Sequence, residues 1–131
     1  MLRIIASVVA GVALWGLLAA GMDYCLRMGW PDYAAVEKAM AFTLPMMAAR
    51  LSESTIALVI ASWAAARIAP GSRAAPWALG IVLLAVFVPI HYGLWNKFPI
   101  WYHAYFLASL LAIPLIVAIA SGRDGAQEAA A

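Results

Sequence analysis

The chain has 131 residues, of which 67% are hydrophobic and only 11% are charged. Soluble domains carry about 25% charged residues, so this composition excludes an ordinary soluble domain. The net charge of +2 is too small to indicate a nucleic acid as a partner. The single cysteine, Cys25, excludes an internal disulfide and a cysteine-based zinc motif.

Four apolar segments, taken in chain order, predict four transmembrane helices. They cover residues 4–22, a stretch that ends near Arg67, residues 76–95 and residues 98–120. Each approaches the roughly 20 residues that cross a bilayer as helix, and none shows the alternation of a barrel strand. Backbone groups in lipid must bond within their own segment, and short links make consecutive helices antiparallel neighbours. We therefore expect an all-α integral membrane protein, with one antiparallel four-helix domain over residues 1–120.

The two ends of the chain carry further signals. The first segment is similar to a secretory signal peptide, because Arg3 precedes an apolar stretch that ends in small residues. Its apolar run is longer than a usual signal core, so we expect the segment to be retained. Residues 121–131 are polar and contain glycine, which predicts a disordered tail.

The link between the first two spans, residues 23–43, is longer than the others. Within it, PDYAAVEKAMAF (31–42) predicts a short helix with Pro31 in its first turn, lying at the membrane interface. The alternative is that this segment extends the second span. Pro45 favours a break there and thus a separate helix.

The distribution of basic residues predicts the orientation in the membrane. Four arginines are expected on one side and three basic residues on the other. These are Arg3, Arg67, Arg73 and Arg123 against Arg27, Lys38 and Lys97. The excess indicates that both termini lie in the cytoplasm, with the chain in the lipid bilayer of the inner membrane.

Two histidines predict a candidate site at the opposite end of the bundle. His91 lies four residues before the end of the third span, and His103 lies five residues into the fourth. With a rise of about 1.5 Å per residue, both lie roughly 6–8 Å below the ends of their helices. We therefore expect them at matched depth on neighbouring helices.

An acidic residue in the second span belongs to the same candidate site. Glu53 begins a stripe in which a small residue, alanine, recurs every fourth position, at Ala57, Ala61 and Ala65. Small residues allow helices to approach closely, so this face, Glu53 included, is expected to turn towards another helix. Arg50, one turn earlier, is expected to pair with Glu53. The simpler interpretation is an ion pair that fixes helix register.

Polar and aromatic residues near this end are secondary candidates. They are Asp23, Tyr24, Tyr92, Trp95, Trp101, Tyr102 and Tyr105. Tyrosine and tryptophan favour the membrane interface, so an aromatic belt accounts for most of them.

The candidate site suggests two kinds of cofactor. His91, His103 and Glu53 form a donor set of the kind that zinc or copper accepts. Methionines near this end would suit Cu(I), although methionine is also an ordinary packing residue. Haem held by the two histidines is the second option, but adjacent helices leave little room for it.

Three classes of function remain. Small residues recur around several faces, at Ser7 and Gly11 and at Ser54 and Ser62, which favours a non-enzymatic accessory or assembly subunit that packs against another membrane protein or a second copy. The alternative is a protein that binds a small ligand or a metal ion, or a dimeric transporter.

Transport would use helices interrupted by proline, at Pro45, Pro89 and Pro114. In size and number of spans the chain is similar to small multidrug transporters and fluoride channels, but it has none of their motifs. The sequence has no Ser-His-Asp spacing that would mark a nucleophile and no glycine-rich phosphate loop, which argues against an enzyme.

Overall fold

The computed structural model describes the backbone of residues 1–130 and the side chains of residues 1–122, and its regular elements are all helices. They are α1 (Leu2–Gly29), α2 (Pro31–Glu37), α3 (Leu44–Ile68), α4 (Ala74–Gly93) and α5 (Ile100–Ala130). Four of them, α1, α3, α4 and α5 as far as Gly122, are long and apolar enough to cross a membrane. The predicted four-span helical bundle with a short helix between the first two spans is confirmed.

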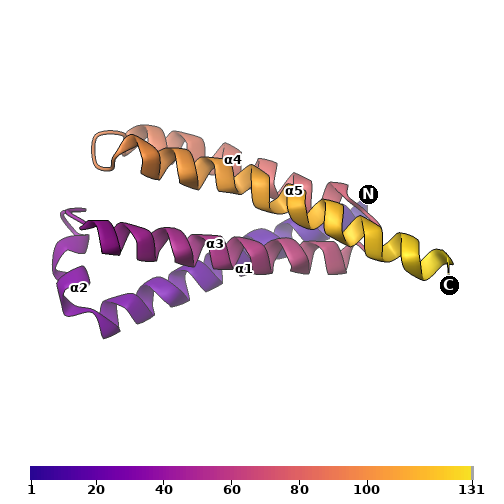
Figure 1. The fold of residues 1–131 in the computed structure, drawn as a ribbon, viewed down its shortest axis with the longest axis horizontal. Helices are drawn as coiled ribbons and strands as arrows, with labels where there is room; N and C mark the ends of the chain where they lie inside the picture. The colour runs from indigo at the N-terminus through magenta and orange to yellow at the C-terminus, as the bar shows by residue number, and fades with distance from the viewer. Residues whose placement is uncertain (131) are drawn as a thin grey trace.

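The four long helices form two pairs. Helix α1 packs mainly against α3, and α4 packs mainly against α5 (Figure 1). Both ends of the chain lie at one end of the bundle, whereas α2 lies at the other end with the α4–α5 link (Figure 1). The α2 end is therefore where the polar residues of several helices can meet.

Helix α1 is longer than predicted, because it continues to Gly29 instead of ending at Met22. Its last turns contain Asp23 and Arg27, which are four residues apart and form an ion pair. An ion pair with this spacing stabilises the helix, and a positively charged arginine in the last turn interacts favourably with the helix dipole. Asp23 is consequently a helical residue and not the start of a loop.

The predicted helix over residues 31–42 is shorter than expected. It begins at Pro31, as predicted, but ends at Glu37, and Met40 follows with a φ of 55°. Pro45 then lies in the first turn of α3, where a missing backbone N–H is tolerated. The expectation that Pro45 interrupts a span is wrong, whereas Pro89 and Pro114 do lie inside α4 and α5.

Helix α3 is the centre of the bundle because small residues line two of its faces. Ala57, Ala61 and Ala65 are completely buried, which confirms that this stripe turns inward. Ser54 and Ser62 are also buried. These small residues of α3 thus pack against helices of the same chain, whereas Ala6 and Ala10 of α1, which also suggested contact with other proteins, are exposed and partly exposed.

The size of the packed side chains changes along the bundle. Near the chain termini, Gly11 lies against Leu79, and Gly80 lies against the backbone of Leu110. Towards the α2 end, large rings such as Phe87 fill the space between the helices. In Figure 1 the α4–α5 pair diverges from the α1–α3 pair in that direction. Large side chains at one end and small ones at the other account for this divergence.

The predicted disordered tail, residues 121–131, remains a prediction. Helix α5 continues to Ala130, while Ala131 and the side chains from residue 123 onward lie outside the described residues. This also applies to the side chain of Arg123.

The contact between α4 and α5 at Gly80 gives a first prediction. A Cβ atom at this position would lie 2.5 Å from the backbone oxygen of Leu110 and 3.0 Å from the ring of Pro114. Because neither backbone nor proline ring can move aside easily, we expect Gly80→Ala to destabilise the fold by about 1–3 kcal/mol. Thermal unfolding in detergent, followed by circular dichroism, measures the change.

Gly16→Ala is the matched control, since a Cβ there meets nothing within 4 Å. It should leave the melting temperature unchanged or raise it, because alanine favours helix. Equal melting temperatures for the two variants would show that the helices do not meet at Gly80.

Candidate functional site

A half-buried arginine, Arg50, joins three helices at the α2 end. The hydroxyl of Tyr33 in α2 donates a hydrogen bond to Oδ1 of Asp23 in α1 at 2.6 Å. Nη1 of Arg50 in α3 donates to the same carboxylate oxygen at 3.2 Å, and also to the Tyr33 hydroxyl. Desolvation by burial raises the pKa of Tyr33, and its hydrogen bond to Asp23 raises it further. Tyr33 therefore keeps its proton and remains a donor.

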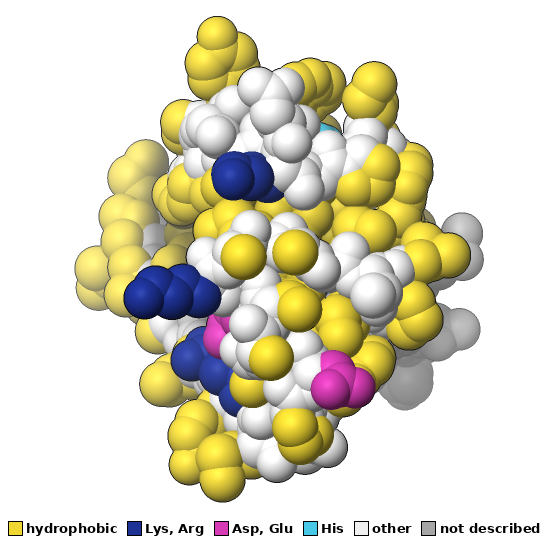
Figure 2. Space-filling view, turned by 90° about the vertical axis from the view of Figure 1, so that its left-hand side faces the viewer, with side chains coloured by type: hydrophobic (Ala, Val, Ile, Leu, Met, Phe, Trp, Pro, Cys, Tyr) yellow, Lys and Arg dark blue, Asp and Glu magenta, His cyan; other side chains and the backbone are white. Residues whose placement is uncertain are grey.

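Further charges extend this network to the surface. Arg27 pairs with Asp23, and its Nε lies 3.1 Å from Oε2 of Glu37. Asp23, Glu37, Arg27 and Arg50 together comprise two acids and two bases, so the network is neutral. Seen from this end, basic and acidic side chains lie side by side at the lower left of the view, while another basic and another acidic side chain stand apart from them (Figure 2).

The predicted pair between Arg50 and Glu53 does not form. Within residues 1–122, Asp23 is the acid that pairs with Arg50, and no ion pair involves Glu53. Helical side chains lean towards the N-terminus of their helix. The Arg50 side chain therefore leans towards α2, while Glu53 lies one turn further from that end.

The structure brings the two histidines into direct contact. Nδ1 of His91 lies 2.8 Å from Nδ1 of His103, and both side chains are buried. The ring of His91 stacks on Phe106 at 4.4 Å between centroids, and that of His103 stacks on Trp95 at 4.8 Å. The predicted matched depth is confirmed, and Nε2 of His103 has no hydrogen-bond partner.

The predicted metal ligands are not assembled. Among the described residues, no group of three or more histidine, cysteine or acidic side chains could hold a metal ion. Glu53 does not join His91 and His103, because it lines a cavity that neither histidine reaches. The two histidines hydrogen-bond to each other, so holding haem iron between them would require that bond to break.

The secondary candidates divide into two groups. Five are well exposed, as an aromatic belt requires: Tyr24, Tyr92, Trp95, Trp101 and Tyr105. Tyr102 is instead buried in the core, and Asp23 belongs to the arginine network. These last two residues contribute to the interior of the α2 end.

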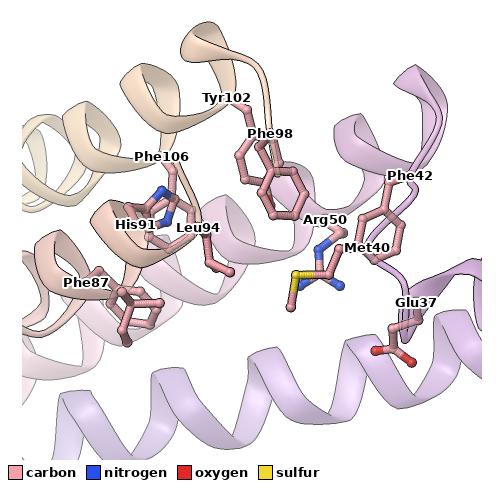
Figure 3. Close-up of a pocket in the computed structure, with 11 residues that line it drawn as sticks. Glu37, Met40, Phe42, Arg50, Phe87, His91, Leu94, Phe98, Tyr102 and Phe106 are labelled. Carbon is pink, nitrogen blue, oxygen red and sulfur yellow. The ribbon is translucent and has the colours of Figure 1, made fainter. Parts of the chain in front are cut away.

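Beside Arg50 lies a cavity of about 220 Å³, called here the aromatic cavity. Its rings come from Phe42, Phe87, Phe98, Tyr102, Phe106 and His91. Figure 3 shows Arg50 between Phe42 on one side and Phe98 and Tyr102 on the other. The guanidinium carbon lies 4.8 Å from the centre of the Phe42 ring, a distance suited to a cation–π contact.

A second cavity of about 140 Å³, called here the polar cavity, lies on another side of Arg50. Trp15, Asp23, Glu53 and Ser54 line it, and it shares Phe87, Tyr102 and Phe106 with the aromatic cavity. Three of its side chains carry buried polar atoms without a hydrogen-bond partner. They are Trp15 Nε1, Arg50 Nε and Ser54 Oγ. Such atoms are rare in folded proteins and mark a position where a further polar group would fit.

The sequence analysis missed Tyr33, Trp15 and Ser54 as site residues. Trp15 carried a signal, since it lies in the middle of the first span, away from the interface where tryptophan is favoured. Ser54 neighbours Glu53, but serine is common in membrane helices and gives no signal alone. Tyr33 could be placed only once the packing of α2 was known.

No protein-family model matches the chain, and no curated protein or solved structure matches it either.

The arginine network gives a second prediction. Asp23→Ala removes the acid that pairs with Arg50 and leaves a half-buried cation, so we expect a loss of about 2 kcal/mol in stability. Glu53→Ala breaks no ion pair and should cost clearly less. Thermal unfolding of both variants in the same detergent tests this order, and the reverse order would show that Glu53 is the true partner of Arg50.

The histidine contact gives a third prediction. His91→Ala and His103→Ala should each destabilise the protein, because each leaves a buried nitrogen without its partner. The double variant should lose less than the sum of the two, with a coupling of about 1 kcal/mol. Strictly additive losses would mean that the Nδ1 atoms do not interact.

Proposed function

We propose that this small membrane protein binds a neutral, lipid-soluble molecule whose hydrogen-bond acceptors lie among Trp15, Arg50 and Ser54. The observation that carries the proposal is the set of three buried, unpaired polar atoms on side chains around the polar cavity. An unpaired buried donor costs about 1–3 kcal/mol, and a ligand that supplies an acceptor recovers much of that cost.

The chemistry of these three atoms indicates an acceptor on the ligand. Indole N–H and guanidinium N–H groups can only donate, and a serine hydroxyl can donate as well. Three donors around one cavity suit a carbonyl or similar oxygen. Water could also satisfy them, but the adjoining aromatic cavity offers water few polar partners.

The aromatic cavity indicates a flat ring beside the acceptor. An apolar cavity of about 150 Å³ can hold benzene, so a volume of about 220 Å³ admits a substituted ring. Phenylalanine and tyrosine rings stack favourably on flat π-systems. Because the two cavities share Phe87, Tyr102 and Phe106, one molecule can occupy both.

The charges around the cavities favour a neutral ligand. The positive charge of Arg50 is already balanced by Asp23 within a network of two acids and two bases. Glu53 adds an acidic group to the polar cavity, which opposes an anion. A quinone-like molecule, with carbonyl oxygens on an uncharged ring, combines the required properties.

The orientation and cellular setting also belong to the proposal. The greater number of arginines near the chain termini favours an inner-membrane protein with both termini in the cytoplasm. The α2 end, with both cavities, would then lie at the opposite face. An accessory role beside another protein stays a prediction from the sequence, and its support is weaker because Ser7, Gly11 and the α3 stripes are used within the bundle.

Binding of a short-chain benzoquinone tests the proposal. A fully substituted ring is used, so that the exposed Cys25 thiol has no open ring position to add to. We expect it to raise the melting temperature of the protein in detergent, whereas an alkylbenzene of similar size should not. Ser54→Ala and Trp15→Phe should each weaken binding by about 3- to 10-fold, because each removes one hydrogen bond.

Ser52→Ala and Trp101→Phe are the matched controls, since both residues are exposed. They should bind the quinone as the unmodified protein does. Equal stabilisation by the alkylbenzene, or stabilisation only by a hydrophobic cation such as tetraphenylphosphonium, would overturn the proposed function.

A further inference from the structure

A groove on the outside of the bundle shares one lining residue with the polar cavity. It runs between the end of α1 and the middle of α3, has a volume of about 460 Å³, and is called here the α1–α3 groove. Its lining consists of Met22, Cys25, Leu26, Gly29, Trp30 and Glu53. Glu53 also lines the polar cavity, so the groove and the cavity meet at this residue.

One face of α1 runs continuously from the cavity into the groove. Trp15 and Ala19 line the polar cavity, and Met22 and Leu26 line the groove. These four residues follow one another at intervals of three or four, which places them along one stripe of the helix. A molecule that follows this stripe leaves the interior without crossing another helix.

The lining of the groove is suited to hydrocarbon. Apart from Glu53 it carries no charged side chain, and Met22, Leu26 and Trp30 provide most of its apolar surface. It opens on the flank of α1, the helix with the least of its apolar segment buried inside the protein. If α1 crosses the bilayer, this flank lies at the end of its apolar segment, where the acyl chains meet the membrane interface.

We infer that the bound molecule carries a hydrocarbon chain that leaves the polar cavity past Glu53 and lies in the α1–α3 groove. The inference rests on the proposed function and narrows its ligand to a ring with carbonyl oxygens and a lipid tail. The ring occupies the aromatic cavity and an oxygen meets the donors beside Arg50. The tail extends along α1 to the lipid, so the molecule enters from the bilayer and not from water.

Cys25 provides a direct test, because it is exposed, lines the groove and is the single cysteine of the chain. Labelling it with N-phenylmaleimide places a bulky ring where the tail would lie. The two probes are tetramethylbenzoquinone, which has no open ring position for the Cys25 thiol to add to, and the same ring with a decyl chain in place of one methyl group. Their dissociation constants are compared before and after labelling by thermal shift in detergent.

We expect labelling to raise the dissociation constant of the decyl probe at least about tenfold and to leave that of the bare ring unchanged. The Cys25→Ser variant, treated in the same way, should bind both probes as before. If the labelled protein still binds the decyl probe normally, the tail does not use this groove and the inference fails, although the proposed function stands.

Two further outcomes distinguish failure of the proposed function from failure of the inference about the tail. If neither probe binds even the unlabelled protein, the proposed function itself fails. If labelling abolishes binding of both probes, Leu26→Trp replaces the label as the obstruction. Loss of decyl-probe binding alone in that variant supports the inference, and unchanged binding of both probes overturns it.

Discussion

The α2 end of this protein depends on the interactions of the half-buried guanidinium of Arg50. A cation inside a membrane-spanning helix is costly, and here a carboxylate from α1, a hydroxyl from α2 and an aromatic ring reduce that cost. The three partners come from separate parts of the sequence, so satisfying one charge fixes their relative positions. Tyr33 in particular holds α2 across this end, and the segment that follows it closes the aromatic cavity with Met40 and Phe42.

The same residue links structure to the proposed binding. The Nη1 atom of Arg50 donates hydrogen bonds to Asp23 and Tyr33. Its Nε atom has no hydrogen-bond partner and lies beside the polar cavity. Because a buried donor gains from a partner, this nitrogen is a position where an acceptor would stabilise the protein. Because Asp23 balances the positive charge of Arg50, the network also weakens the attraction between this arginine and an anionic ligand. What remains is a set of directed donors in a cavity with aromatic walls, which is the basis for expecting a neutral acceptor.

The spans, the inward face of α3 and the matched depth of the two histidines could be predicted from the sequence. Each follows from a regular geometry, either the length of an apolar run or the rise and period of a helix. The partner of Arg50 could not be found in this way. The spacing along α3 predicted Glu53 as the partner of Arg50. In the structure the Arg50 side chain leans towards the N-terminus of α3, and the extra turns of α1 bring Asp23 within reach of it. The polar cavity could not be predicted from the sequence either, because Trp15 and Ser54 line the same cavity only when α1 packs against α3.

The position of the cavities follows from how side-chain size is distributed along four short helices. Gly11, Gly80 and the alanines of α3 let the helices close tightly near the chain termini. At the other end, Phe87, Tyr102 and Phe106 hold the two helix pairs apart, and flat rings leave gaps that aliphatic side chains would fill more completely. A bundle of this size has little interior volume, so space is concentrated where the rings are. The half-buried guanidinium of Arg50 lies beside that space. It gives a small protein both an apolar pocket and a polar anchor, the two features that a site for a ring-bearing lipid requires.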